Sequence, residues 1–205
     1  MRSRESSRRG DVRPPSWRCD GRSAAEGSRL RASEHGVVPS AQEIHELIHR
    51  YETGPRLLEA VLAGVSEDEI RFSPGPGHWS IHENVVHVAD VDLVGAARIR
   101  YLLAEPGATP ASFNGTRWSQ ILDYRAQPLD EALGLIRAVR RWTADLLARL
   151  PDAAWDQTGI HWEQPAPGAE PVALTLAQAV AHQIEHTQVH LRTIAKRRAQ
   201  YAQAK

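Results

Sequence analysis

The sequence has little sulfur and no long apolar run. Cys19 is the only cysteine among 205 residues, which excludes an internal disulfide and a metal site built from cysteine thiolates. No apolar run approaches the ~20 residues that span a bilayer, and the longest is Ala60 to Val65. The N-terminal region also lacks the apolar core of a secretory signal peptide. We therefore expect a cytoplasmic protein that is not inserted in a membrane.

The chain also lacks a net charge, but its charges are unevenly distributed. Residues 1–38 carry nine Arg against five acidic residues, and the remaining residues carry 16 basic and 20 acidic side chains. The first segment is rich in Arg, Ser and Gly, has no apolar periodicity and is predicted to be a disordered extension. Residues 39–205 are predicted to form one folded domain. Its excess of acidic residues gives no reason to expect nucleic acid as a partner.

The apolar periodicity of residues 39–205 predicts an all-α protein. Side chains recur at helical spacing, and Ser80 with Glu83 and Thr175 with Gln178 have the spacing of N-terminal capping boxes. Gly54-Pro55 is expected to kink the first helix. The four predicted helices cover about 40–64, 80–103, 129–150 and 175–199.

The connections between these helices complete the prediction. A long connection follows Glu105-Pro106-Gly107 and contains one short helix near 118–124, and a proline-rich loop covers about 152–174. No segment shows the alternation of a strand. The expected fold is an up-down four-helix bundle.

Histidine is abundant, with ten residues, and three of them share one helix face. His182, His186 and His190 follow at steps of four, which places them on one stripe ~80° wide beside the apolar face. Two imidazoles at this spacing suit one metal ion, and a third ligand must come from another helix. His87 is the best candidate, with Asp90 expected to accept its other ring N–H. The alternative is a set of ordinary histidines that are satisfied by backbone and water.

A second motif competes with this site. His45-Glu46-Leu47-Ile48-His49 matches H-E-x-x-H, the helix motif of zinc proteases. No strand is predicted beside it, and Glu52 and Pro55 occupy the positions where the extended motif has Gly and His. We therefore expect His45 and His49 to be surface residues.

Two segments resemble the DinB-like superfamily of metal-binding four-helix bundles. They are WSIHENVVHVAD (79–90), from the predicted second helix, and HTQVHLRTI (186–194), from the fourth. The resemblance implies that His87, His186 and His190 are the metal ligands and that His182 is a neighbour, although a frame one turn earlier would pair His182 with His186. Arg98 lies where many members carry Arg, and it is expected to contact an anionic ligand or to pair with Asp90 or Asp92. The fourth helix lacks the HRGQ-like ending of many members, which leaves the subfamily open.

A site of three histidines leaves a coordination position open, as catalytic metal sites do. Imidazole ligands suit Zn or Ni, with Fe or Cu as alternatives. Members of this superfamily include transferases and isomerases that use thiols such as bacillithiol or mycothiol, which implies a metal-dependent S-transferase acting on a small-molecule thiol and an electrophile. The alternatives are a hydrolase that uses a metal-bound water and a non-catalytic, stress-related metal-binding bundle. A homodimer is left open.

Overall fold

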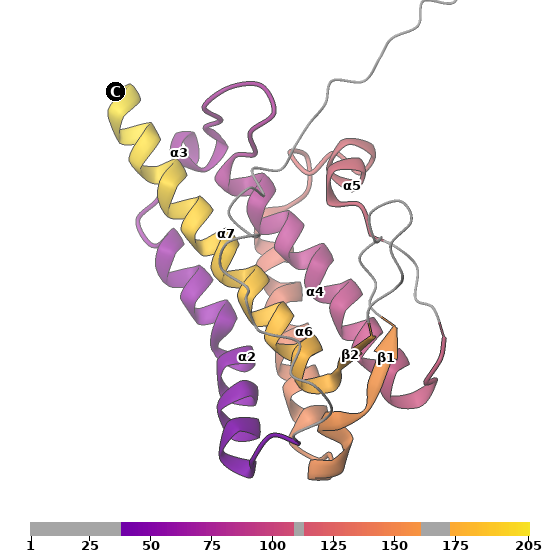
Figure 1. The fold of residues 1–205 in the computed structure, drawn as a ribbon. Coiled ribbons are helices and arrows are strands. Elements are labelled where there is room, and N and C mark those ends of the chain that lie inside the picture. Colours follow the sequence, from indigo (N-terminus) through magenta and orange to yellow (C-terminus); the bar gives the residue numbers. More distant parts are fainter. Residues whose placement is uncertain (1–37, 109–112, 161–172) are drawn as a thin grey trace, which may run out of the picture.

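The computed structural model describes residues 38–108, 113–160 and 173–205 (Figure 1). Four long helices pack into a bundle, which confirms the predicted all-α four-helix fold. Nearly all of the predicted N-terminal extension lies outside the described residues. The long helices are α2 (Ala41–Leu62), α4 (Ile81–Ala104), α6 (Leu129–Leu147) and α7 (Leu176–Ala204). The short elements are α3 (Glu67–Arg71), α5 (Gly115–Ile121), the 3-10 helix η2 (Asp152–Asp156) and the strands β1 (Thr158–Ile160) and β2 (Ala173–Thr175).

Local sequence explains where the helices begin. Both predicted capping boxes are present: Ser80 and Glu83 start α4, and Thr175 and Gln178 start α7. In each, the N-cap side chain accepts from the backbone N–H three residues on, and the side chain at that position accepts in return. Because these bonds satisfy two otherwise unpaired donors, each N-cap contributes about 1 kcal/mol. The same arrangement at Ser40 starts α2.

The third long helix runs in the same direction as the second. Both α4 and α6 begin at the end of the bundle that carries α3 and α5 (Figure 1). Val85 and Ala132, from the first halves of the two helices, share one apolar cluster, and Leu102 and Leu147 near their ends share another. The long helices are therefore ordered up, down, down, up, which differs from the alternating up-down order expected from the sequence.

A polar layer lies between the two apolar clusters. The Arg140 guanidinium donates to both carboxylate oxygens of Asp92 at 2.7 and 2.6 Å, and to Thr187 Oγ1 at 2.7 Å. Its Nη1 also approaches the Tyr51 carbonyl at 3.5 Å. Pro55 has no N–H for that carbonyl, and α2 continues through the proline as one helix. Arg140, which lies on α6, therefore contacts the other three long helices.

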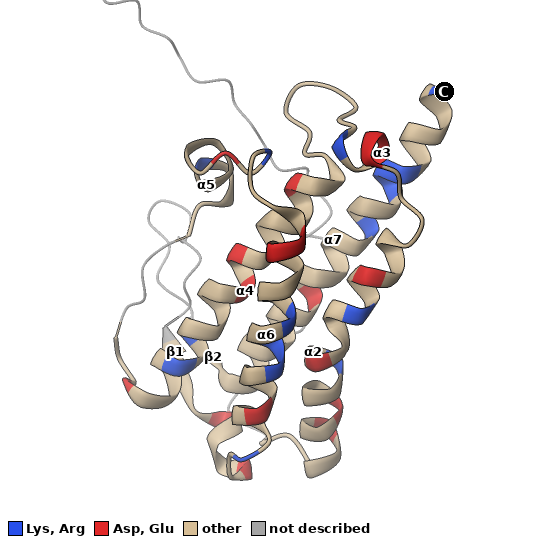
Figure 2. Ribbon diagram, turned by 180° about the vertical axis from the view of Figure 1, so that it is seen from behind, with Lys and Arg blue, Asp and Glu red and all other residues tan. Residues whose placement is uncertain are grey.

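The predicted proline-rich loop contains structure that the sequence analysis did not anticipate. β1 pairs with β2 in an antiparallel arrangement, with Gly159 opposite Leu174. Strands of three residues are too short to show an alternating pattern, which explains why they were not predicted. Among the described helices, none combines the length and apolar character that crossing a membrane requires. Acidic and basic side chains are interspersed along the helices rather than separated by sign (Figure 2).

Candidate metal centre

His87, His186 and His190 lie together in the bundle. Each offers one ring nitrogen, and these three nitrogens lie within 4.8 Å of one another. The ring centroid of His87 lies 5.3 Å from that of His186 and 4.8 Å from that of His190. The ring centroids of His186 and His190 are 4.5 Å apart. Three nitrogens around a tetrahedral ion would be separated by about 3.4 Å, so only small ring movements separate this arrangement from a metal site.

The structure distinguishes these histidines from the other candidates. His182 lies one turn before His186, is half-buried and does not belong to the three-histidine group. His45 and His49 are exposed on α2, and neither joins a group of three ligands within the described residues. The H-E-x-x-H match therefore has no third ligand in that part of the chain.

Burial keeps the three imidazoles neutral. It lowers the pKa of His87 and His186 well below the usual value, and neighbouring histidines lower both further. Burial alone lowers the pKa of His190 to about 4. At pH 7 each ring therefore has an unprotonated nitrogen, which is the form that binds a metal. The donor set and its protonation state fit a divalent ion.

Asn84 orients His190. The amide nitrogen of Asn84 donates to the Ser80 carbonyl at 2.7 Å, which leaves its oxygen facing His190 Nδ1 at 2.8 Å. Because this oxygen can only accept, Nδ1 carries the proton and Nε2 keeps its lone pair. The sequence analysis missed Asn84, although it lies one turn before His87 on the same helix.

The hydrogen bond predicted between Asp90 and His87 is not formed in this structure. The Asp90 carboxylate accepts a hydrogen bond from the Tyr124 hydroxyl at 2.6 Å, while His87 Nδ1 is buried and has no hydrogen-bond partner among the described residues. Gly115 instead packs against the His87 ring, since a Cβ built there would lie 2.5 Å from Cε1 and 2.9 Å from Nδ1. Only glycine fits this position without moving the imidazole.

Aromatic rings surround the His87 imidazole. The centroid of the Trp79 ring lies 4.6 Å from that of His87, and the Phe113 ring stacks on it at 5.8 Å. Tyr124 adds a third ring at 6.4 Å. These rings exclude water from one side of the group and strengthen electrostatic interactions within it.

Arg98 is buried in α4. The two carboxylates considered as its partners are engaged elsewhere, Asp92 by Arg140 and Asp90 by Tyr124. Contact of Arg98 with an anionic ligand stays a prediction.

The sequence and the fold are both similar to those of known proteins. The sequence model described as "DinB superfamily" matches residues 50–194, which include all three histidines. The chain is 27% identical over 151 residues to a candidate metal-dependent hydrolase of Bacillus licheniformis, covering 73% of this chain and 82% of that protein. A similar candidate hydrolase of Oceanobacillus iheyensis is 23% identical over 155 residues, covering 76% and 87%.

A solved structure shows the same fold. YfiT from Bacillus subtilis is described as a probable metal-dependent hydrolase with an unusual four-helix bundle topology. It superimposes with a TM-score of 0.72 at 18% sequence identity, covering 82% of this chain and 93% of YfiT. The match of the superfamily model over most of the chain shows that this protein belongs to the DinB superfamily.

Proposed function

We propose that His87, His186 and His190 bind one divalent metal ion and that the protein transfers a low-molecular-weight thiol to a small electrophile. The observation that carries this proposal is the convergence of three neutral imidazole nitrogens from two helices, in a group without carboxylate or cysteine. Such a donor set suits Zn or Ni and leaves room for an exogenous ligand.

The surrounding residues favour a thiol over water as the nucleophile. When bound, a divalent ion lowers the pKa of a coordinated thiol, so that the thiol reacts at neutral pH without help from a protein base. The two acidic side chains nearest to His87 along α4 are both engaged. Glu83 accepts from Ser80 and from Arg125, and Asp90 accepts from Tyr124. Because both carboxylates already accept hydrogen bonds within the protein, they are poorly placed to act as the general base that hydrolysis usually needs.

A metal-dependent hydrolase is the second candidate. The names of the relatives from Bacillus licheniformis and Oceanobacillus iheyensis, and the description of YfiT, favour it. Both enzymatic candidates use the same three ligands and differ in the nucleophile. A non-catalytic metal-binding bundle would share the ligands and lack both activities.

The first experiment tests the ligands. Replacing His186 by Ala removes half of the pair on α7, so metal measured after purification should fall to a small fraction of the wild-type content. The circular dichroism spectrum should be unchanged, because the core of the bundle does not depend on one ion. His45→Ala, on the exposed face of α2, is the matched control and should retain the metal. Full occupancy in His186→Ala would refute the ligand assignment.

The second experiment separates the candidates. A small-molecule thiol added to the Co²⁺-loaded protein should produce a sulfur-to-metal charge-transfer band, followed by conjugation when an electrophile is added. An unchanged spectrum together with turnover of ester or amide substrates would instead identify the hydrolase. An unchanged spectrum without turnover would indicate the non-catalytic protein.

A further inference from the structure

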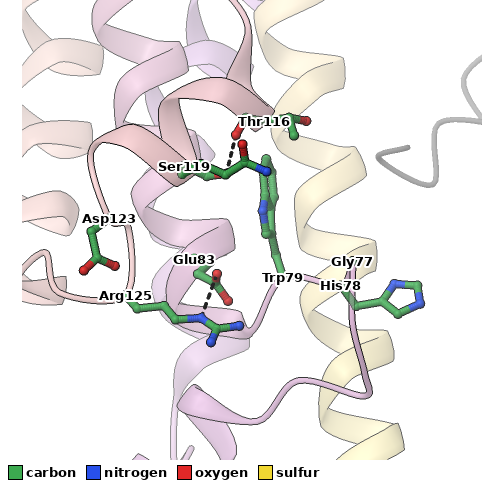
Figure 3. A pocket seen from close by; sticks show the side chains of 9 residues that line it. Gly77, His78, Trp79, Glu83, Thr116, Ser119, Asp123 and Arg125 are labelled. Carbon is green, nitrogen blue, oxygen red and sulfur yellow. Dashed lines mark hydrogen bonds and ion pairs between the residues drawn. The ribbon is translucent and has the colours of Figure 1, made fainter. Parts of the chain in front are cut away.

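The described residues form a cavity of about 280 Å³ (Figure 3). It lies between α5, the start of α4 and the segment that leads into α6. Its walls include Trp79, Glu83, Ser119, Gln120, Asp123 and Arg125. This volume accommodates a small organic molecule of a few carbon atoms with polar substituents.

The cavity and the histidines share a wall. Trp79 lines the cavity, and its ring also packs against His87. Glu83 lies four residues before His87 on α4, which is a rise of about 6 Å. Thr116 lines the cavity directly after Gly115, the residue that touches the His87 ring. The Trp79 ring thus contacts both the cavity and the three-histidine group.

The cavity contains one ion pair, between Glu83 and Arg125, and one further carboxylate, that of Asp123. Both oxygens of Glu83 are engaged, Oε2 by Ser80 and Oε1 by Arg125 Nε at 3.1 Å. Arg125 Nη1 and Nη2 have no hydrogen-bond partner among the described residues. The same holds for the Asp123 carboxylate, whose residue adopts a left-handed backbone conformation with φ of 45°. The Asp123 carboxylate and the terminal nitrogens of Arg125, whose side chain is 68% exposed, therefore line the same pocket as the indole ring of Trp79 without a protein partner among the described residues.

We infer that this cavity binds the ammonium and carboxylate groups of a small zwitterion. Asp123 accepts from the ammonium, the terminal nitrogens of Arg125 donate to the carboxylate, and the apolar part of the molecule lies against Trp79. Because Glu83 and Asp123 together outweigh Arg125 in charge, a multiply charged anion is disfavoured. Recognition of the zwitterion needs no metal, whereas presentation of its thiol to the histidines rests on the proposed function.

The test measures binding to the cavity in the absence of metal. His186→Ala provides the background, after dialysis against a chelator, and NMR titration provides the affinities. The probes are L-cysteine, cysteamine, which lacks the carboxylate, and 3-mercaptopropionate, which lacks the amine. L-cysteine should bind about tenfold more tightly than either analogue, since each analogue loses one charge-assisted contact.

Variants then assign each contact to a residue. Asp123→Asn should abolish the preference for L-cysteine over 3-mercaptopropionate, and asparagine tolerates the left-handed conformation. Arg125→Gln should abolish the preference over cysteamine, while Arg125→Lys retains the charge and should restore part of it. Asp130→Asn and Arg141→Gln, both exposed on α6, are the matched controls and should bind like the background protein.

Three results would overturn the inference: no binding of L-cysteine, equal affinity for all three probes, or a preference that survives both Asp123→Asn and Arg125→Gln. These results would leave the metal centre untouched, because metal content and the Co²⁺ spectrum are measured separately. Conversely, zwitterion binding without a thiol-dependent Co²⁺ spectrum would support the cavity and contradict the proposed thiol transfer.

Discussion

Loss of the Asp92 charge should destabilise the protein more than loss of a typical surface ion pair. The side chains of Asp92 and Arg140 are 1% and 2% exposed, and two hydrogen bonds of 2.6 and 2.7 Å join them. Asp92→Asn retains the shape of the side chain but leaves the guanidinium of Arg140 without a counter-charge. Because both side chains are almost fully buried, solvation can compensate little for the loss.

The expected cost follows from this burial. Removing one partner of a buried pair costs about 3–5 kcal/mol, whereas an exposed pair is worth at most about 1 kcal/mol. The total free energy of unfolding of a domain is about 5–15 kcal/mol, so Asp92→Asn should remove a large part of it. Urea unfolding followed by circular dichroism measures the difference, with Glu59→Gln as the control. Glu59 pairs with Arg137 at 2.7 Å on the surface, where both side chains are exposed.

A double substitution separates the charge from the packing. Asp92→Leu with Arg140→Met removes both charges and should recover most of the stability lost in Asp92→Asn, because no unpaired buried charge is left. Thr187 and the Gln183 carbonyl, which also accept from Arg140, lose a donor, so recovery should be incomplete. A cost below about 1 kcal/mol for Asp92→Asn would refute the reasoning.

Three further perturbations test the metal centre. Asn84→Ala removes the acceptor that orients His190 and should weaken metal affinity about 10–100-fold in a chelator competition, with unchanged helix content; unchanged affinity would contradict the assignment. Gly115→Ala places a Cβ 2.5 Å from His87 Cε1 and should weaken metal affinity by about tenfold or more in the same assay. Wild-type affinity would show that α5 moves to accommodate the added methyl group without displacing His87. In metal-free protein above pH 6.5, the three histidines of the site are neutral in the folded and the unfolded chain. Below pH 6.5 the unfolded chain takes up protons, whereas burial lowers the pKa of His190 in the folded chain to about 4 and keeps that ring neutral. The free energy of unfolding should therefore fall between about pH 6.5 and 4, by about 3 kcal/mol for His190 alone, and a flat urea midpoint over this range would contradict the burial of that ring.

Local signals in the sequence predicted the helices well. The capping residues Ser80 and Thr175 and the apolar periodicity place α4 and α7 within a residue of their observed starts, because a helix start depends on side chains three residues apart. The four-residue spacing of His186 and His190 likewise requires that both lie on one face of α7. The direction of α6 has no such local signal, because it depends on the path of the whole connection before it.

The surroundings of the histidines depend on contacts between distant parts of the chain. Asn84 and His190 are 106 residues apart in the sequence, and their hydrogen bond forms only because α4 and α7 pack side by side. Asp90 lies near His87 along α4, which suggested a hydrogen bond between them, but its carboxylate accepts from the Tyr124 hydroxyl, 34 residues away in the sequence. The sequence alone determined which residues form helices and which histidines share a face, since both follow from the geometry of a single helix. Only the tertiary structure decided which polar atoms meet, because hydrogen-bond partners are selected by distances of about 3 Å between elements whose arrangement depends on the packing of the entire core.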